Sequence, residues 1–130
     1  MASLNVQLVQ KFYAALGDKN LDGAAALLAD DIQIHQGAAI PWGGVFAGKS
    51  GFRDFVQLLF QSITTVVELS EFVDSENKVV AIGTSRGRAN NSGRSFDIRI
   101  VHLWEVESGR LSKWEIYIDV PAMQEALGGS

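Results

Sequence analysis

The chain has 130 residues, of which 47% are hydrophobic and 20% are charged; this matches one globular domain, predicted over residues 1–130, and excludes a disordered chain. A net charge of −4 without any lysine or arginine cluster excludes nucleic acid and anionic membranes as partners. The chain has no cysteine and no signal-peptide pattern, and its apolar stretches are far shorter than the about 20 residues that a membrane helix needs. We therefore expect a cytoplasmic protein without disulfides.

Helices are predicted in the first half of the chain and at its end. Apolar residues fall at helical spacing, or form a short run, over residues 4–16, 24–29, 52–63 and 122–127. A polar N-cap is expected before each of the first three helices: Ser3, then Asn20 or Asp22, then Ser50. Pro121 is tolerated in the first turn of the last helix.

Strands dominate the second half of the chain. Alternating patterns bounded by turn residues predict strands over residues 32–36, 64–74, 78–89, 95–107 and 111–119. Residues 37–51 are predicted to form an apolar loop that lies against another part of the protein. Because helices come first and a meander of strands follows, the sequence predicts an α+β fold with one mostly antiparallel sheet.

Alternation along the long strands assigns their side chains to two faces. His102 and Trp104 share one face of their strand, and Trp114 and Ile116 share one face of the next. Another strand carries only small residues on one face: Ala81, Gly83, Ser85, Gly87 and Ala89. Because protein interiors pack densely, the volume beside these residues must go to a helix or to a ligand. The opposite face is also half apolar, which predicts that a partner subunit covers it.

Several segments carry a family resemblance. KFYAALGDKNLDGAAALLADDIQI resembles the opening of the nuclear transport factor 2-like superfamily, in its SnoaL-like and ketosteroid isomerase-like branch. PWGGVFAGKSGFRDF, HLWEVESGRLSKWEIYID and VPAMQEALG extend the resemblance over nearly the whole chain. It implies a cone-shaped, cystatin-like fold, in which a curved sheet wraps around the N-terminal helices and encloses a pocket, and a homodimer that forms through the outer sheet face. This fold hosts isomerases, hydrolases, cyclases and binding proteins, so it does not specify the function.

Most catalytic residues of the related enzymes are replaced here. Ketosteroid isomerases use a tyrosine, an aspartate base and an aspartate acid, and the resemblance places Phe12, Gln36 and His102 at those positions. Glutamine cannot remove a proton, so isomerisation by that route is not expected. The histidine of the polyketide cyclases falls on His102, whereas their acid falls on an isoleucine. The acid–arginine–acid set of limonene-epoxide hydrolases falls on residues without charge: Gly83, Ser85 and Ile116.

His102 is the principal candidate for a functional residue. Its imidazole is predicted to act as a general acid–base or to donate a hydrogen bond to a ligand oxygen; the alternative is a buried structural histidine. Gln36 is the second catalytic candidate, because its amide would bind a carbonyl or position a water. Residues predicted to contact the substrate are Phe12, Tyr13, Trp42, Ser85, Trp104, Trp114 and Ile116. Neither histidine has a carboxylate at metal-binding spacing, so no metal or other cofactor is expected.

Several of these residues have a second interpretation. Trp42 either closes the mouth of the pocket or anchors a dimer contact, and Trp104 and Trp114 form either the pocket wall or the core. Tyr13 replaces the missing helix tyrosine only if the first helix is slightly rotated. The sequence therefore leaves three hypotheses: an isomerase- or cyclase-type acid–base enzyme acting on a small apolar carbonyl or hydroxyl compound, a non-catalytic ligand-binding protein, and a dimerising interaction module whose cavity is filled by tryptophan.

Overall fold

The computed structural model describes residues 3–128 and has the predicted α+β composition. Its elements in chain order are α1 (Leu4–Gly17), α2 (Leu21–Ala25), β1 (Leu28–Gln36), β2 (Gly44–Ala47), α3 (Gly48–Ser62), β3 (Ile63–Ser75), β4 (Lys78–Ala89), β5 (Ser95–Glu107), β6 (Arg110–Ile118) and α4 (Val120–Ala126). Within this described part of the chain, no helix is long and apolar enough to cross a membrane.

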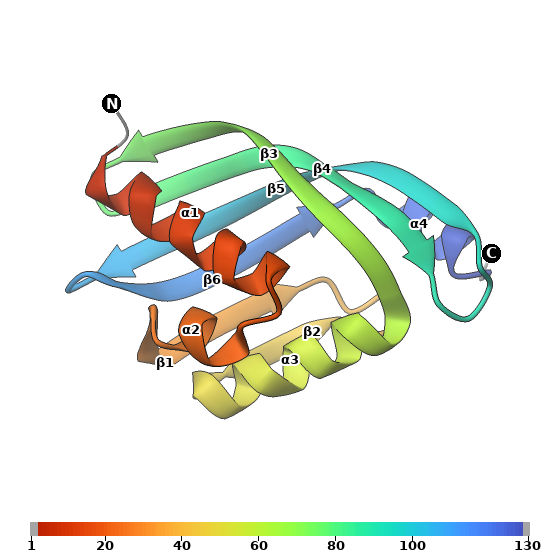
Figure 1. The fold of residues 1–130 in the computed structure, drawn as a ribbon, viewed down its shortest axis with the longest axis horizontal. Helices are drawn as coiled ribbons and strands as arrows, with labels where there is room; N and C mark the ends of the chain where they lie inside the picture. Colours follow the sequence, from red (N-terminus) through yellow and green to blue (C-terminus); the bar gives the residue numbers. More distant parts are fainter. Residues whose placement is uncertain (1–2, 129–130) are drawn as a thin grey trace.

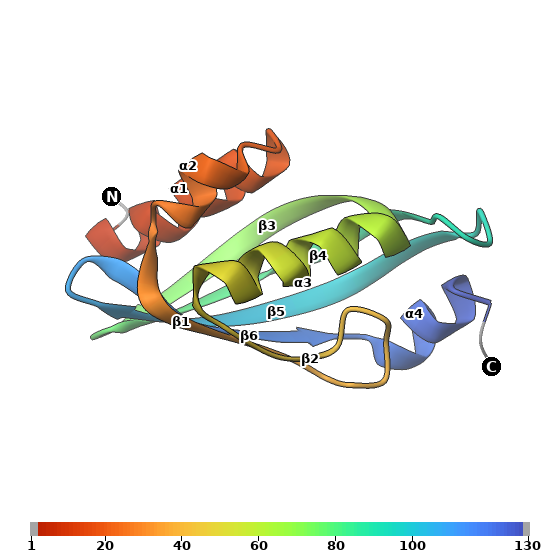
Figure 2. The same ribbon diagram turned by 90° about the horizontal axis from the view of Figure 1, so that it is seen from below.

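The six strands form one curved sheet in the order β2-β1-β6-β5-β4-β3 (Figure 1). All neighbouring strands are antiparallel except β1 and β6, which run parallel. Figure 2 shows α1, α2 and α3 on the same side of the sheet, with α4 near the end where the chain terminates. The hydrophobic core lies between these helices and the inner sheet face. The predicted mostly antiparallel sheet is thus confirmed.

The ends of the elements confirm some sequence expectations and correct others. Ser3 caps α1 by accepting a hydrogen bond from the Val6 N–H, and Asn20 caps α2 in the same way. Ser50 is not an N-cap, because α3 begins two residues earlier and is preceded by Ala47, which has no capping side chain. The second helix ends at Ala25 rather than at residue 29, since β1 already begins at residue 28.

The predicted loop over residues 37–51 contains a strand. Residues 44–47 form β2, an edge strand that pairs antiparallel with β1 and continues directly into α3. A four-residue edge strand has little periodicity of its own, and its main-chain hydrogen bonds to β1 stabilise it. The rest of the loop packs inward as predicted, because Ile40 and Trp42 are both buried.

The small-residue face of β4 points inward as predicted, but it serves a different purpose at two positions. A β-carbon on Gly83 or Gly87 would overlap the backbone of β3, at the carbonyl oxygens of Glu68 and Thr64 respectively. Glycine at these positions lets β3 bend closely over β4, which corrects the expectation that a helix or ligand fills this volume. Ser85, which lies between the two glycines, points into the interior.

Candidate functional site

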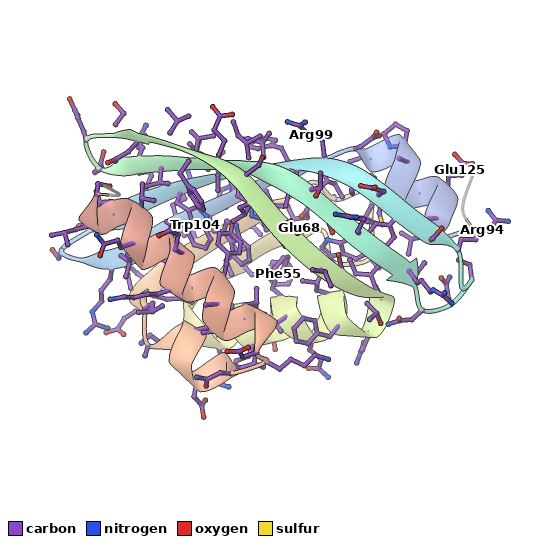
Figure 3. All side chains as sticks on the ribbon, turned by 45° about the horizontal axis from the view of Figure 1, so that its top comes forward. Phe55, Glu68, Arg94, Arg99, Trp104 and Glu125 are labelled. Carbon is purple, nitrogen blue, oxygen red and sulfur yellow. The ribbon has the colours of Figure 1, made fainter. Side chains whose placement is uncertain are left out.

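A cavity of about 70 Å³ lies between the inner sheet face and the helices. One water needs only about 10–15 Å³ measured in this way, so the cavity has room for a small organic group. Most of its wall is aliphatic or aromatic, and Figure 3 shows Phe55 and Trp104 among the side chains gathered in this interior. No carboxylate, lysine or arginine is found among the described lining residues, whose most polar members are Tyr13, Gln36, Thr65, Ser85 and His102.

Strand register brings Gln36 and His102 to the same part of the cavity. Gln36 pairs with Ile116 across β1 and β6, and Ile116 pairs with His102 across β6 and β5. Since neighbouring strands lie about 4.8 Å apart, the backbones of Gln36 and His102 are about 10 Å apart, with Ile116 between them. All three side chains line the cavity. Residues that are 66 positions apart in the sequence therefore face the same space.

A chain of polar contacts ends at His102. The indole N–H of Trp104 donates to the Tyr13 hydroxyl oxygen at 3.0 Å, and this hydroxyl forms a short hydrogen bond with Nδ1 of His102. The Tyr13 ring also stacks on the imidazole, with centroids 5.7 Å apart. Helix α1 thus supplies a tyrosine to the site, at the position next to the phenylalanine that the family resemblance placed there.

Burial keeps both members of the Tyr13–His102 pair neutral. Burial lowers the pKa of His102 to about 3, so its imidazole is uncharged at neutral pH. Burial also raises the pKa of Tyr13 far above its ordinary value, and the indole groups of Trp104 and Trp114 only partly oppose this rise. Tyr13 as a whole residue is half-buried, but its hydroxyl lies in the interior. The pair therefore offers hydrogen bonds, not charge, to a ligand.

Two buried polar atoms at the cavity have no hydrogen-bond partner among the described residues. They are Oε1 of Gln36 and Nε1 of Trp114, on side chains that belong to residues 6% and 2% exposed. A buried polar atom without a partner costs about 1–3 kcal/mol of stability. The fold of the described residues therefore leaves one acceptor and one donor unpaired beside the cavity.

Ser85 lines the cavity, and its hydroxyl forms a hydrogen bond with the hydroxyl of Thr65. Its Oγ lies 2.6 Å from Oγ1 of Thr65, which also donates to the Arg86 carbonyl oxygen at 3.1 Å. Sequence reasoning did not single out Thr65, although β3 carried a usable signal. Thr65 shares the inward face of that strand with Ile63 and Val67, and all three line the cavity. The alternation rule applied to β5 and β6 would have found it.

The three tryptophans lie at different depths. Trp42 is buried on the cavity wall and is not an exposed dimer anchor, and Trp114 lines the wall as well. Trp104 lies behind the wall, stacked on Trp114 with centroids 4.7 Å apart. Phe12 is in the same second layer and packs edge-on against both Trp104 and Trp114. Phe12 and Trp104 were predicted to contact substrate, but the structure does not place them on the cavity surface.

A curved sheet and N-terminal helices that enclose an apolar cavity with a few polar groups define a class of cone-shaped α+β proteins. The chain belongs to the SnoaL-like domain family, whose model matches residues 9–114. This match and the structural neighbours below confirm the resemblance inferred from the sequence, including the nuclear transport factor 2-like cone fold.

Solved structures share this fold over almost the whole chain. A nuclear transport factor 2-like protein of unknown function from Burkholderia pseudomallei is 30% identical over 97% of this chain and 98% of its own, with a TM-score of 0.91. TerC, co-crystallised with polyporic acid, is 21% identical over 98% of this chain and 100% of its own, with a TM-score of 0.90. A protein from Jannaschia sp. that is assigned as a SnoaL-like polyketide cyclase is 16% identical over 98% of this chain and 93% of its own, with a TM-score of 0.86. No curated protein shows significant similarity to the sequence.

Proposed function

We propose that the chain binds a small, neutral, largely apolar molecule in this cavity and that His102 donates a hydrogen bond to a carbonyl or hydroxyl oxygen of that molecule. The hydrogen bonding of the two His102 ring nitrogens is the observation that carries the proposal. Nδ1 is engaged by Tyr13, whereas no hydrogen bond to Nε2 is found within residues 3–128. The residue lines a wall without charged groups, where a neutral ligand is favoured over an ion.

The same geometry suggests a limited chemistry. A neutral imidazole that donates from Nε2 polarises a carbonyl group, which is half of an isomerase or cyclase mechanism. The other half is a base, and Gln36 cannot serve as one. Ligand binding with polarisation of the bound oxygen is therefore the function that we favour. Acid–base catalysis of isomerase or cyclase type is the second candidate, favoured by the contact between Tyr13 and His102.

Ligand binding is tested by fluorescence, since Trp42 and Trp114 line the cavity. A panel of cyclohexenones, aryl ketones and naphthols is titrated into the protein and into two variants. We expect His102→Phe to weaken binding of the ketones by about tenfold, the loss of one buried hydrogen bond of about 1.4 kcal/mol. His35→Phe changes the chain's other histidine, which bonds to Gln33 outside the cavity lining, and should bind like the parent.

Two results would contradict the binding proposal: no member of the panel binds, or His102→Phe binds ketones as tightly as the parent. Catalysis is tested on the same ketones by the exchange of their α-protons in deuterated water. Exchange that the parent accelerates and His102→Phe does not would favour the enzyme. Equal rates with and without the parent protein would reject the enzyme and leave the binding protein.

We also propose that a second copy of the chain covers the outer sheet face. An apolar band crosses that face in register: Ile82, Val101 and Tyr117 are neighbours across β4, β5 and β6, and Val80 pairs with Leu103 in an adjacent row. Val101 is 37% exposed and Tyr117 is 56% exposed. An uncovered apolar band of this kind is typical of an interface.

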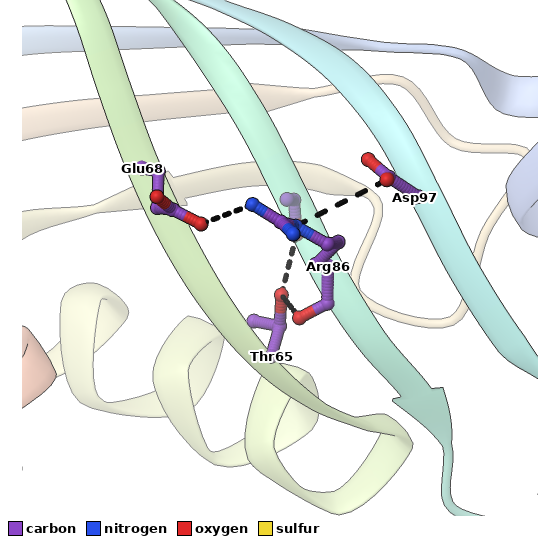
Figure 4. A network of polar contacts seen from close by, with 5 residues as sticks. Thr65, Glu68, Arg86 and Asp97 are labelled. Carbon is purple, nitrogen blue, oxygen red and sulfur yellow. Dashed lines mark hydrogen bonds and ion pairs between the residues drawn. The ribbon is translucent and has the colours of Figure 1, made fainter.

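Charge at the edge of the band favours a copy of the same chain as the partner. Arg86 forms ion pairs with Glu68 and Asp97 on this face (Figure 4). Arg99, also on this face, has no ion pair within the described part of the chain. The face thus offers acids and a free base together, which is what a two-fold interface needs in order to complement itself.

The dimer is tested by light scattering coupled to size-exclusion chromatography. The parent should have the mass of a dimer, and Val101→Glu should have that of a monomer, because a buried carboxylate would face the apolar band of the partner. Leu4→Glu places the same charge at an exposed position of α1, on the opposite side of the sheet, and should remain dimeric. A monomeric parent, or a dimeric Val101→Glu variant, would reject the proposed interface.

A further inference from the structure

Trp104 does not line the cavity, but its indole N–H points at Tyr13, the residue that is hydrogen-bonded to His102. Its indole N–H donates to the Tyr13 oxygen at 3.0 Å, and the residue is fully buried. The Trp114 indole also acts on the Tyr13 hydroxyl, although not in hydrogen-bonding geometry. An indole N–H can only donate, so Trp104 must occupy one of the lone pairs of the tyrosine oxygen.

The proton of the Tyr13 hydroxyl then has one destination. Among the described residues, Nδ1 of His102 is the acceptor within hydrogen-bond distance of this oxygen. If His102 carried its proton on Nδ1, two N–H groups would face the tyrosine oxygen and the phenolic proton would have no acceptor in a buried site. The indole N–H and the phenolic O–H both have an acceptor when Trp104 donates to the Tyr13 oxygen and the Tyr13 hydroxyl donates to Nδ1 of His102. This arrangement leaves the single proton of the neutral imidazole on Nε2.

We propose that Trp104 is a positioning residue that acts through Tyr13 to hold His102 in its Nε2–H form, so that the cavity prefers a carbonyl over the corresponding alcohol. A carbonyl oxygen only accepts hydrogen bonds, which suits a fixed Nε2–H donor. An alcohol must also place its own proton, which Nε2 in this form cannot accept, so the alcohol depends on a second acceptor such as the hydroxyl oxygen of Ser85 or Thr65, whereas the ketone needs none. The proton position in the free protein follows from the contacts alone, whereas the ligand preference rests on the proposed function.

The proton position is tested without any ligand, by long-range ¹H–¹⁵N NMR correlations of the histidine rings at neutral pH. In the parent, His102 should show a protonated Nε2 and an unprotonated Nδ1. Trp104→Phe removes the indole N–H and the part of the ring that carries it, so a water can enter beside the tyrosine oxygen and accept the hydroxyl proton. Nδ1 can then donate to the tyrosine oxygen, and His102 should become a mixture of both forms. Tyr13→Phe should have the same effect. Trp42 has no hydrogen bond to Tyr13 among those described, so Trp42→Phe should show the same NMR pattern as the parent.

Ligand preference is then measured as the ratio of affinities for cyclohexanone and cyclohexanol. We expect Trp104→Phe to reduce the ketone preference by about fivefold, equivalent to about 1 kcal/mol. Thermal unfolding shows whether Trp104→Phe is folded, and Tyr13→Phe provides a second variant if it is not. A protonated Nδ1 in the parent, an unchanged pattern in a folded Trp104→Phe variant, or an unchanged pattern in Tyr13→Phe would overturn the inference. If neither compound binds but the NMR patterns change as stated, the proposed function fails and the positioning role stands.

Discussion

Replacing Gly87 with alanine is expected to lower the free energy of unfolding by about 3 kcal/mol or more. The new β-carbon would overlap the Thr64 carbonyl oxygen and lie close to the Thr65 α-carbon, so it meets backbone and not a side chain that can move aside. Either β3 shifts away from β4 or the pairing of the two strands breaks locally. Chemical denaturation monitored by tryptophan fluorescence measures the loss.

The same substitution has a matched control at the end of α1. Gly17→Ala adds an identical methyl group where no heavy atom lies within 4 Å, and alanine is the better helix former by up to about 1 kcal/mol. This variant should be as stable as the parent or more stable. Comparable destabilisation by both variants would mean that close approach of β3 is not what requires glycine on β4. Gly83→Ala should behave like the Gly87 variant, because its β-carbon would overlap the Glu68 carbonyl oxygen.

Acidification should destabilise the protein through His102. Its pKa is about 3 in the folded protein and near the ordinary 6.5 in the unfolded chain, so the unfolded chain binds the proton first. The stabilising effect of the neutral imidazole is fully present above pH 6.5 and is lost as the pH falls from about 6.5 towards 3. Between pH 7 and pH 5 the loss should be about 2 kcal/mol.

The measurement compares the parent with His102→Gln by denaturation at both pH values. Glutamine also accepts a hydrogen bond from Tyr13 but does not titrate, and subtraction removes the contributions that other groups make in both proteins. Between pH 7 and pH 5, the free energy of unfolding of the parent should fall by about 2 kcal/mol more than that of His102→Gln. Equal slopes would show that His102 becomes protonated without cost in the folded state, which would also remove the basis for a neutral imidazole at the cavity.

Local patterns in the sequence predicted the parts of the fold that depend on local physics. Alternation placed Ser85, His102, Trp114 and Ile116 on the inner sheet face, and the structure has all four on the cavity wall. The N-cap at Ser3 was predicted, and Asn20 was one of two candidates for the next helix, because a side-chain oxygen next to a free backbone N–H is a local signal. The edge strand β2 was missed, because its pairing to β1 is a contact between segments and not a pattern within one.

The amino-acid sequence by itself determined the composition of the site: one histidine on an apolar face, no acid at the positions that the related enzymes use, and tryptophan close by. Only the tertiary structure decided whether Phe12 or Tyr13 meets His102. Both lie on the apolar side of α1, and successive helical residues point about 100° apart, so the rotation of the docked helix chooses between them. That rotation is set by packing against the sheet, between residues that are about 90 positions apart in the chain. Periodicity along the sequence carries no information about it.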